Sequence, residues 1–186
     1  MTARVLLLAS GSGSVLQALL DSGVRGAIIA VGSDRPQAGA LQRAQSAGVE
    51  TFVVDFDGFQ ERAEWSQALL ATLERYQPTL IVLAGFMRIL DPSLVQAFRG
   101  RIINTHPALL PSFPGAHAVR DALAAGVRVT GCTVHWVDEG VDTGPIIDQV
   151  AVRVLDDDDA ATLHERVKAV ERELLVSVVA RLVTQS

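Results

Sequence analysis

The sequence predicts an α/β fold, built as a doubly wound, mostly parallel sheet with helices on both faces. Short apolar runs alternate with helical patterns along the chain, which is the order of a βαβ fold. The first four runs are apolar at successive positions and rich in β-branched residues, as strands covered on both faces are. Only residues 138–145 separate the last two runs, so we expect these to be antiparallel neighbours in a mixed sheet.

The elements follow one another in a regular order. Fully buried strands are predicted at residues 5–9, 27–31, 51–54 and 80–84. Leu and Ala recur at spacings of three and four between them, which predicts helices at residues 14–21, 40–47 and 61–76. After residue 90 we expect a helix at 93–98, a strand at 102–105, a helix at 119–125, strands at 129–137 and 146–154, and a last helix from 161 to about 184. Ligands of such a sheet bind at the carboxyl ends of its strands.

Composition narrows the class of protein. A chain of 186 residues with 49% hydrophobic residues can bury a core as one domain, which we expect to span residues 1–186. The net charge is −5 and the basic residues are scattered, which argues against a nucleic-acid partner.

The sequence also carries expectations about compartment. Cys132 is the only cysteine, so neither an intrachain disulfide nor a cysteine zinc site can form, and a reducing cytosol fits best. The first apolar run is too short for a signal peptide, and no run approaches the roughly 18 residues of a membrane helix. We therefore expect a cytoplasmic protein without a membrane anchor.

A glycine loop follows the first predicted strand and opens the first helix. Its residues are Ser10, Gly11, Ser12, Gly13 and Ser14. Free backbone N–H groups at such a turn can bind an anion, and a small phosphate monoester is the preferred ligand. A structural tight turn remains the plain alternative.

Two other phosphate motifs fit this loop less well. Leu16 stands where a dinucleotide fingerprint has its third glycine, and the Gly-Lys-Ser/Thr of a P-loop is absent. Asp34, about twenty residues further on, lies where an acid that binds the ribose of NAD would fall, which keeps that reading open.

Asn104 and His106 form the most informative pair. They lie two residues apart at the end of a predicted strand, so their side chains share one face. Three prolines and Gly115 stiffen the loop that follows, as a preorganised site requires. The plain alternative is a capping asparagine and a surface histidine.

A second polar segment follows the next strand. Gly140 and Gly144 bracket Asp142 and can hold its carboxylate in place. If the two strands are neighbours, Asp142 reaches His106, favours its charged form and orients the ring. An Asx turn is the structural alternative for Asp142. His135, in the middle of that strand, is expected to be a core or supporting histidine rather than a catalytic one.

These segments together carry a resemblance to a known family. The Gly11–Ser14 loop, Ala-Gly-Phe-Met-Arg-Ile-Leu at 84–90, the block Asn-x-His-Pro-x-Leu-Leu-Pro-x-x-Pro-Gly at 104–115 and residues 131–149 resemble the folate-dependent formyltransferases that act on glycinamide ribonucleotide. The resemblance implies a Rossmann-like formyltransferase fold. It also implies transfer of a formyl group from 10-formyltetrahydrofolate to the amine of glycinamide ribonucleotide, in purine synthesis, without a metal.

The resemblance also assigns roles to residues. Asn104, His106 and Asp142 match the catalytic trio of the family. Substrate-binding positions correspond to Gly11, Ser12, Gly13, Ser14, Arg62, Met87 and Glu171, with Arg62 expected at the substrate phosphate. The folate positions correspond to Arg88, Ile89, Leu90, Asn104, Val137, Asp138, Val141 and Asp142. The first half, to about residue 100, would bind the phosphate, and residues from about 101 would hold the folate and the catalytic groups.

Two departures and several rival functions remain. Val15 stands where many members have asparagine, and the chain ends in its last helix without the tail of some members. The rivals are a formyltetrahydrofolate hydrolase, a methionyl-tRNA or sugar-amine formyltransferase, and a non-catalytic nucleotide-binding module. The length argues against the hydrolase and the tRNA enzyme, which carry an added domain. The expected partners are small molecules, and a homodimer is left open.

Overall fold

A single sheet organises residues 3–185, which are the residues that the computed structural model describes. Its strand order is β3-β2-β1-β4-β5-β6-β7. The strands are β1 (Val5–Leu8), β2 (Ile28–Ser33), β3 (Glu50–Val53), β4 (Leu80–Leu83), β5 (Ile102–His106), β6 (Val129–Trp136) and β7 (Ile146–Arg153). The first five are parallel, whereas β6 is antiparallel to both β5 and β7. The predicted mixed, mostly parallel sheet is confirmed.

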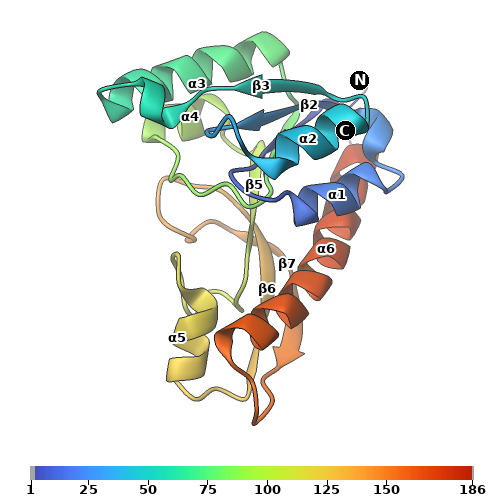
Figure 1. The fold of residues 1–186 in the computed structure, drawn as a ribbon, viewed down its shortest axis with the longest axis vertical. Helices are drawn as coiled ribbons and strands as arrows, with labels where there is room; N and C mark the ends of the chain where they lie inside the picture. The colour runs from blue at the N-terminus through green and yellow to red at the C-terminus, as the bar shows by residue number, and fades with distance from the viewer. Residues whose placement is uncertain (1–2, 186) are drawn as a thin grey trace.

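Helices cover both faces of this sheet (Figure 1). They are α1 (Ser14–Leu20), α2 (Gly39–Ser46), α3 (Arg62–Tyr76), α4 (Pro92–Ala97), α5 (Ala118–Ala124) and α6 (Ala160–Thr184), with short 3-10 turns at Arg25–Ala27 and Phe56–Gly58. Residues of α1, α2, α5 and α6 pack into one core, and those of α3 and α4 pack into a second core on the other face. No helix in residues 3–185 combines the length and apolarity needed to cross a membrane.

The two cores explain the uninterrupted apolar runs. Along β1, Val5 and Leu7 belong to one core, and Leu6 and Leu8 belong to the other. Successive side chains of a strand point to opposite faces, so a strand in the middle of this sheet needs an apolar residue at every position. All four residues of β1 and of β4 are buried accordingly.

The expectation that residues 51–54 form a fully buried strand is wrong. β3 is an outer strand of the sheet, and Val53 is 41% exposed. Phe52 is half-buried and stacks on Tyr76, with ring centroids 5.1 Å apart. These apolar residues therefore lie at a sheet edge that the rest of the protein covers only in part.

The last helix begins with a capping box. The Asp159 side chain accepts from the backbone N–H of Thr162 at 2.8 Å, and the Thr162 hydroxyl lies 2.9 Å from the Asp159 backbone N–H. Asp158 pairs with Arg166 at 2.6 Å, and its side chain is only 2% exposed. The acidic lead into α6 is thus structured at its last two residues.

Candidate active site

The pairing of β5 with β6 gathers polar side chains on one face of the sheet. Asn104 lies opposite His135, and His106 lies opposite Thr133. Directly paired residues of antiparallel strands point to the same face, so all four side chains share the face opposite α6. Thr105, between Asn104 and His106, points to the α6 side, where its hydroxyl lies 3.3 Å from Sγ of Cys132.

Asp142 is brought to this face by the loop between β6 and β7. Its backbone has a φ of 55°, in the left-handed region, which aspartate tolerates better than most residues. The loop passes close beside β6, because a Cβ at Gly144 would stand 1.8 Å from the Trp136 carbonyl oxygen. Only glycine fits there, so the loop can fold back and present Asp142 to the strand face.

The Asp142 carboxylate lies between two imidazole rings. Its Oδ2 is 3.3 Å from Nδ1 of His106 and accepts from the Gly115 backbone N–H at 2.8 Å. Its Oδ1 is 3.6 Å from Nε2 of His135. The side chain of Asp142 is 12% exposed. The predicted approach of Asp142 to His106 is therefore present in the structure.

Both ring nitrogens of His106 face acceptors. Nε2 lies 2.8 Å from the Phe113 carbonyl oxygen, and Nδ1 faces the Asp142 carboxylate. A carbonyl or an ionised carboxylate can only accept, so both contacts are satisfied together when both nitrogens carry a proton. The surroundings of His106 thus suit the imidazolium form.

Neighbouring donors keep Asp142 ionised. The pKa of Asp142 is lowered to about 2, and polar contact with His135 makes the largest contribution to this shift. Burial opposes this effect, while the Gly115 amide and the charge of His106 add to it. Asp142 is therefore an anion throughout the neutral range.

Replacing His135 by phenylalanine is expected to raise the pKa of Asp142 from about 2 toward its ordinary value of 3.8, because the main stabilising contact of the carboxylate is lost. The change is measured by following the carboxyl carbon of Asp142 in an NMR titration. His164→Phe, on α6 against the other face, is the matched control. An unchanged value would assign the depressed pKa to Gly115 and His106 alone.

The glycine loop is a tight turn that leads into α1. Gly13 has a φ of 74°, and a Cβ there would lie 2.7 Å from the Ala40 Cα, so only glycine fits. Gly11 and Ser12 are exposed, and the Gly11 carbonyl accepts from the Ala40 N–H at 3.1 Å. The Ser10 hydroxyl accepts from the Met87 backbone N–H at 2.8 Å, which ties this loop to the segment after β4.

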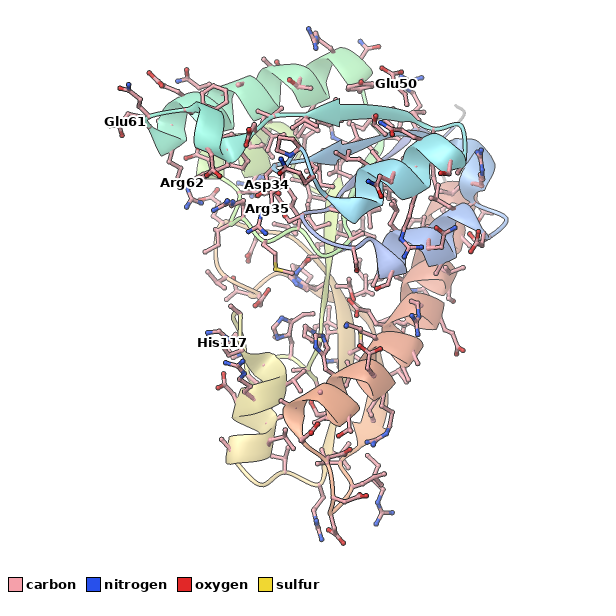
Figure 2. The ribbon with its side chains drawn as sticks, in the orientation of Figure 1. Asp34, Arg35, Glu50, Glu61, Arg62 and His117 are labelled. Atoms are coloured by element: carbon pink, nitrogen blue, oxygen red, sulfur yellow. The ribbon has the colours of Figure 1, made fainter. Side chains whose placement is uncertain are left out.

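Two arginines expected to bind ligands have partners within the protein. Arg62 is the first residue of α3, and Arg88 lies in the segment after β4. Nε of Arg88 donates to the buried Asp34 carboxylate at 2.8 Å, and its guanidinium stands 3.8 Å above the Phe56 ring. Arg62 donates to the Ile89 carbonyl. Figure 2 shows Asp34, Arg35 and Arg62 on one side of the molecule, above His117. Asp34 was considered above as a residue that could bind the ribose of NAD. In the structure its carboxylate pairs with Arg88 instead.

The residues expected at the folate differ in exposure. Ile89 and Val141 are exposed, as is Met87, which was expected at the ribonucleotide and is 70% exposed. Leu90 is buried in the second core, and Val137 packs against that core. Asp138 holds its own loop, since its Oδ1 accepts from the Gly140 N–H and the Thr143 hydroxyl.

Glu171 lies on α6, on the other side of the sheet from Asn104. It is 7% exposed, and burial raises its pKa above the ordinary value. The Thr105 hydroxyl opposes this rise by contact with the carboxylate. A ligand that touches both His106 and Glu171 must therefore pass around the end of β5.

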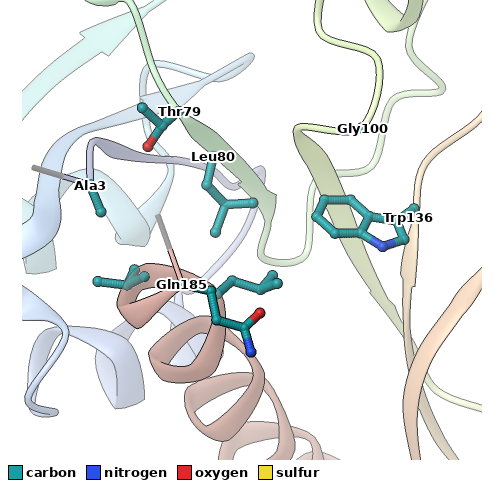
Figure 3. A pocket seen from close by; sticks show the side chains of 8 residues that line it. Ala3, Thr79, Leu80, Gly100, Trp136 and Gln185 are labelled. Carbon is teal, nitrogen blue, oxygen red and sulfur yellow. The ribbon is translucent and has the colours of Figure 1, made fainter. Parts of the chain in front are cut away.

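A small pocket of about 180 Å³ lies between the start of β4, Trp136 and the end of α6 (Figure 3). None of the predicted site residues lines it. Among residues 3–185, no group of three or more His, Cys, Asp or Glu side chains is arranged to hold a metal ion.

The sequence predicted a core or supporting role for His135, but it did not indicate two other members of this cluster. His135 is buried and contacts both Asn104, at 3.3 Å between Nδ2 and Nε2, and Asp142. Thr133 and Gln149 bond to the loop after β5 and were not singled out. The available signal was the alternation of Thr133 and His135 along one strand, but only the register places them opposite Asn104 and His106.

Comparison with known proteins gives a consistent picture. Residues 3–179 match the model of the formyl transferase family. The chain is 52% identical over 185 residues to phosphoribosylglycinamide formyltransferase of Mycobacterium tuberculosis, covering 98% of this chain and 86% of that protein. It is 39% identical to the protein of that name from Bacillus subtilis, covering 96% and 94%. The solved glycinamide ribonucleotide transformylase 1 from Symbiobacterium toebii superposes with a TM-score of 0.94 at 41% identity, covering 99% and 89%.

Proposed function

The chain belongs to the formyl transferase family, and we propose that it transfers the formyl group of 10-formyltetrahydrofolate to the amine of glycinamide ribonucleotide in purine synthesis. The observation that carries the assignment of the site is the meeting of Asn104, His106 and Asp142 on one sheet face, with Asp142 3.3 Å from His106. A nucleotide-binding module would have no use for that arrangement.

Formyl transfer needs donors where negative charge develops. The amine attacks the formyl carbon, whose oxygen becomes an anion before the bond to the folate nitrogen breaks. Asn104 and protonated His106 are the donors that we assign to this oxygen. His106 must exchange its Phe113 carbonyl partner for the oxyanion to do so. No covalent bond to the protein is needed.

One proton also has to move. The attacking amine loses it, and the leaving nitrogen of the folate gains it. We assign Asp142 to this transfer, through a water, because its carboxylate is partly exposed and remains ionised. Its Oδ2 also faces Nδ1 of His106 at 3.3 Å and orients that ring.

Two groups of residues would hold the reactants. Residues to about 100 would bind the ribonucleotide, with its phosphate on the backbone of Gly11 to Ser14 and with Arg62 and Met87 nearby; Glu171 would bind it from α6. The folate would contact the backbone of Arg88, Ile89 and Leu90 and the loop of Val137, Asp138 and Val141. The buried side chain of Leu90 supports a backbone contact there.

The proposed reactants are small molecules, so the site requires neither a nucleic acid nor a membrane. We place the protein in the cytoplasm, where its free, buried Cys132 stays reduced.

An absorbance assay of folate deformylation tests the function. We expect deformylation that requires glycinamide ribonucleotide. A hydrolase would deformylate the folate without any amine, and a sugar-amine formyltransferase would require its own amine instead. Absence of deformylation with every amine would support a binding module and contradict the proposal.

Arg62→Ala is expected to raise KM for glycinamide ribonucleotide more than it lowers kcat, because a phosphate contact is similar in the ground and transition states. Steady-state kinetics with each substrate varied in turn measure the change. Arg75→Ala, near the other end of the same helix, is the control. Since Arg62 contacts the Ile89 carbonyl, a rise confined to KM for the folate would move its role from the phosphate to the folate.

A further inference from the structure

Gln149 lies on β7, the outer strand of the sheet, and takes no part in the proposed chemistry. Its side chain points to the face that carries His106, because it pairs with Thr133 across β6 and β7. Nε2 of Gln149 donates to the Leu110 carbonyl at 2.9 Å and to the Thr133 hydroxyl at 2.9 Å. One amide group therefore donates both to the loop after β5, at Leu110, and to Thr133, which itself contacts that loop.

Thr133 is fully buried and makes the second half of this contact. Its hydroxyl donates to the Ala108 carbonyl at 2.7 Å and accepts from the Leu110 N–H at 3.1 Å. With Gln149 as its third partner, the hydroxyl has no spare capacity. Gln149 and Thr133 together clamp the loop at residues 108–110.

The clamped loop runs on to the catalytic groups. Three residues beyond Leu110, the Phe113 carbonyl accepts from Nε2 of His106 at 2.8 Å. Two residues later, the Gly115 N–H donates to Asp142 at 2.8 Å. One short segment therefore contacts both the imidazole and the carboxylate. Gln149 and Thr133 fix the start of this segment at residues 108–110, so they influence where Phe113 and Gly115 lie.

We propose that Gln149, acting with Thr133, is a positioning residue that sets the relative placement of His106 and Asp142 by clamping the loop at residues 108–110. The inference rests on the proposed function for its kinetic consequence. A misplacement of about 1 Å at a reacting centre can cost about 10²-fold in rate, even when its cause lies away from the chemistry. Gln149 touches no reacting atom.

Gln149→Leu and Gln149→Glu test the clamp. The first keeps the size of the side chain, and the second keeps its length but replaces the donor by an oxygen. We expect both to lower kcat about 10-fold to 10²-fold with KM for both substrates little changed. Val150→Thr, the next residue with its side chain on the other face, should keep normal kinetics.

A paired change at Thr133 provides a second test should a Gln149 variant fail to fold. Thr133→Ser keeps the hydroxyl and should retain most activity, whereas Thr133→Val should lose kcat as the Gln149 variants do. A normal kcat in folded Gln149→Leu or Gln149→Glu, or a rise of KM alone, would overturn the proposal. Equal loss in the serine and valine variants would also count against it.

The pKa of Asp142 gives a measurement that is independent of activity. In Gln149→Leu we expect it to rise above about 2, because the Gly115 N–H is no longer held on the carboxylate, and in Val150→Thr we expect no change. If the wild-type protein shows no formyl transfer, the proposed function fails, and this titration alone decides whether Gln149 positions the pair. An unchanged value in Gln149→Leu then overturns the inference.

Discussion

Asn104→Ala is expected to lower kcat about 10²-fold to 10³-fold and to leave both KM values little changed. Loss of one donor to a developing oxyanion costs about 2.7–4 kcal/mol, and alanine removes one of the two donors that we assign to this oxygen. The neutral formyl oxygen of the bound folate gains less from that donor, so binding is affected less. Steady-state kinetics with each substrate varied measure the split.

The control for Asn104→Ala is Gln42→Ala, which removes an exposed amide from α2. It should have wild-type kinetics. A large rise in KM of Asn104→Ala at near-normal kcat would make Asn104 a binding residue. Because Asn104 also contacts His135 at 3.3 Å, the Asp142 pKa should be measured in the variant to detect any displacement of that ring.

Asp142→Asn is expected to lower kcat about 10³-fold to 10⁴-fold, as loss of charge beside an active-site histidine does in a hydrolase triad. Asparagine keeps the size of the side chain but removes the negative charge that lies 3.3 Å from Nδ1 of His106. Asp142 has a pKa of about 2, so the wild-type enzyme already has the full charge at neutral pH. The difference in kcat between the two proteins should therefore persist from about pH 6 to pH 8.

The same substitution has a signature in stability. A carboxyl whose pKa is lower in the folded state stabilises the fold above its unfolded pKa, and this contribution is lost as the pH falls through the folded value. The difference in unfolding free energy between wild type and Asp142→Asn should therefore shrink between pH 3.8 and about 2. Asp121→Asn on α5 is the exposed control.

A kcat near that of wild type in Asp142→Asn would remove Asp142 from the mechanism.

Much of the fold could be predicted because local pattern and global position agree in it. β1 and β4 lie in the middle of the sheet and show it by being apolar at every position. The short connection before β7 correctly predicted an antiparallel pair. β3 misled because Phe52 and Val53 are apolar at a sheet edge, and strand order is not a local property.

The site was predictable where one short segment contains it. Asn104 and His106 share a strand, and their spacing places them together. Arg62 contacts the Ile89 carbonyl across a sequence separation of 27, and Arg88 pairs with Asp34 across a separation of 54. Rules based on local spacing do not predict contacts at such separations. The clamp by Gln149 depends on the register of two strand pairs, and register is a property of the assembled sheet.

The alternation of side chains along β5 makes this enzyme intolerant of length changes just before it. Deleting one residue in the connection from α4 could slide β5 by one position against its neighbours, which would turn Thr105 toward Asp142 and send Asn104 and His106 to the α6 side. Point substitutions in that connection leave each β5 side chain on its face of the sheet, whereas inserting or deleting one residue moves each to the opposite face. We therefore expect length variants there to be inactive even where they still fold.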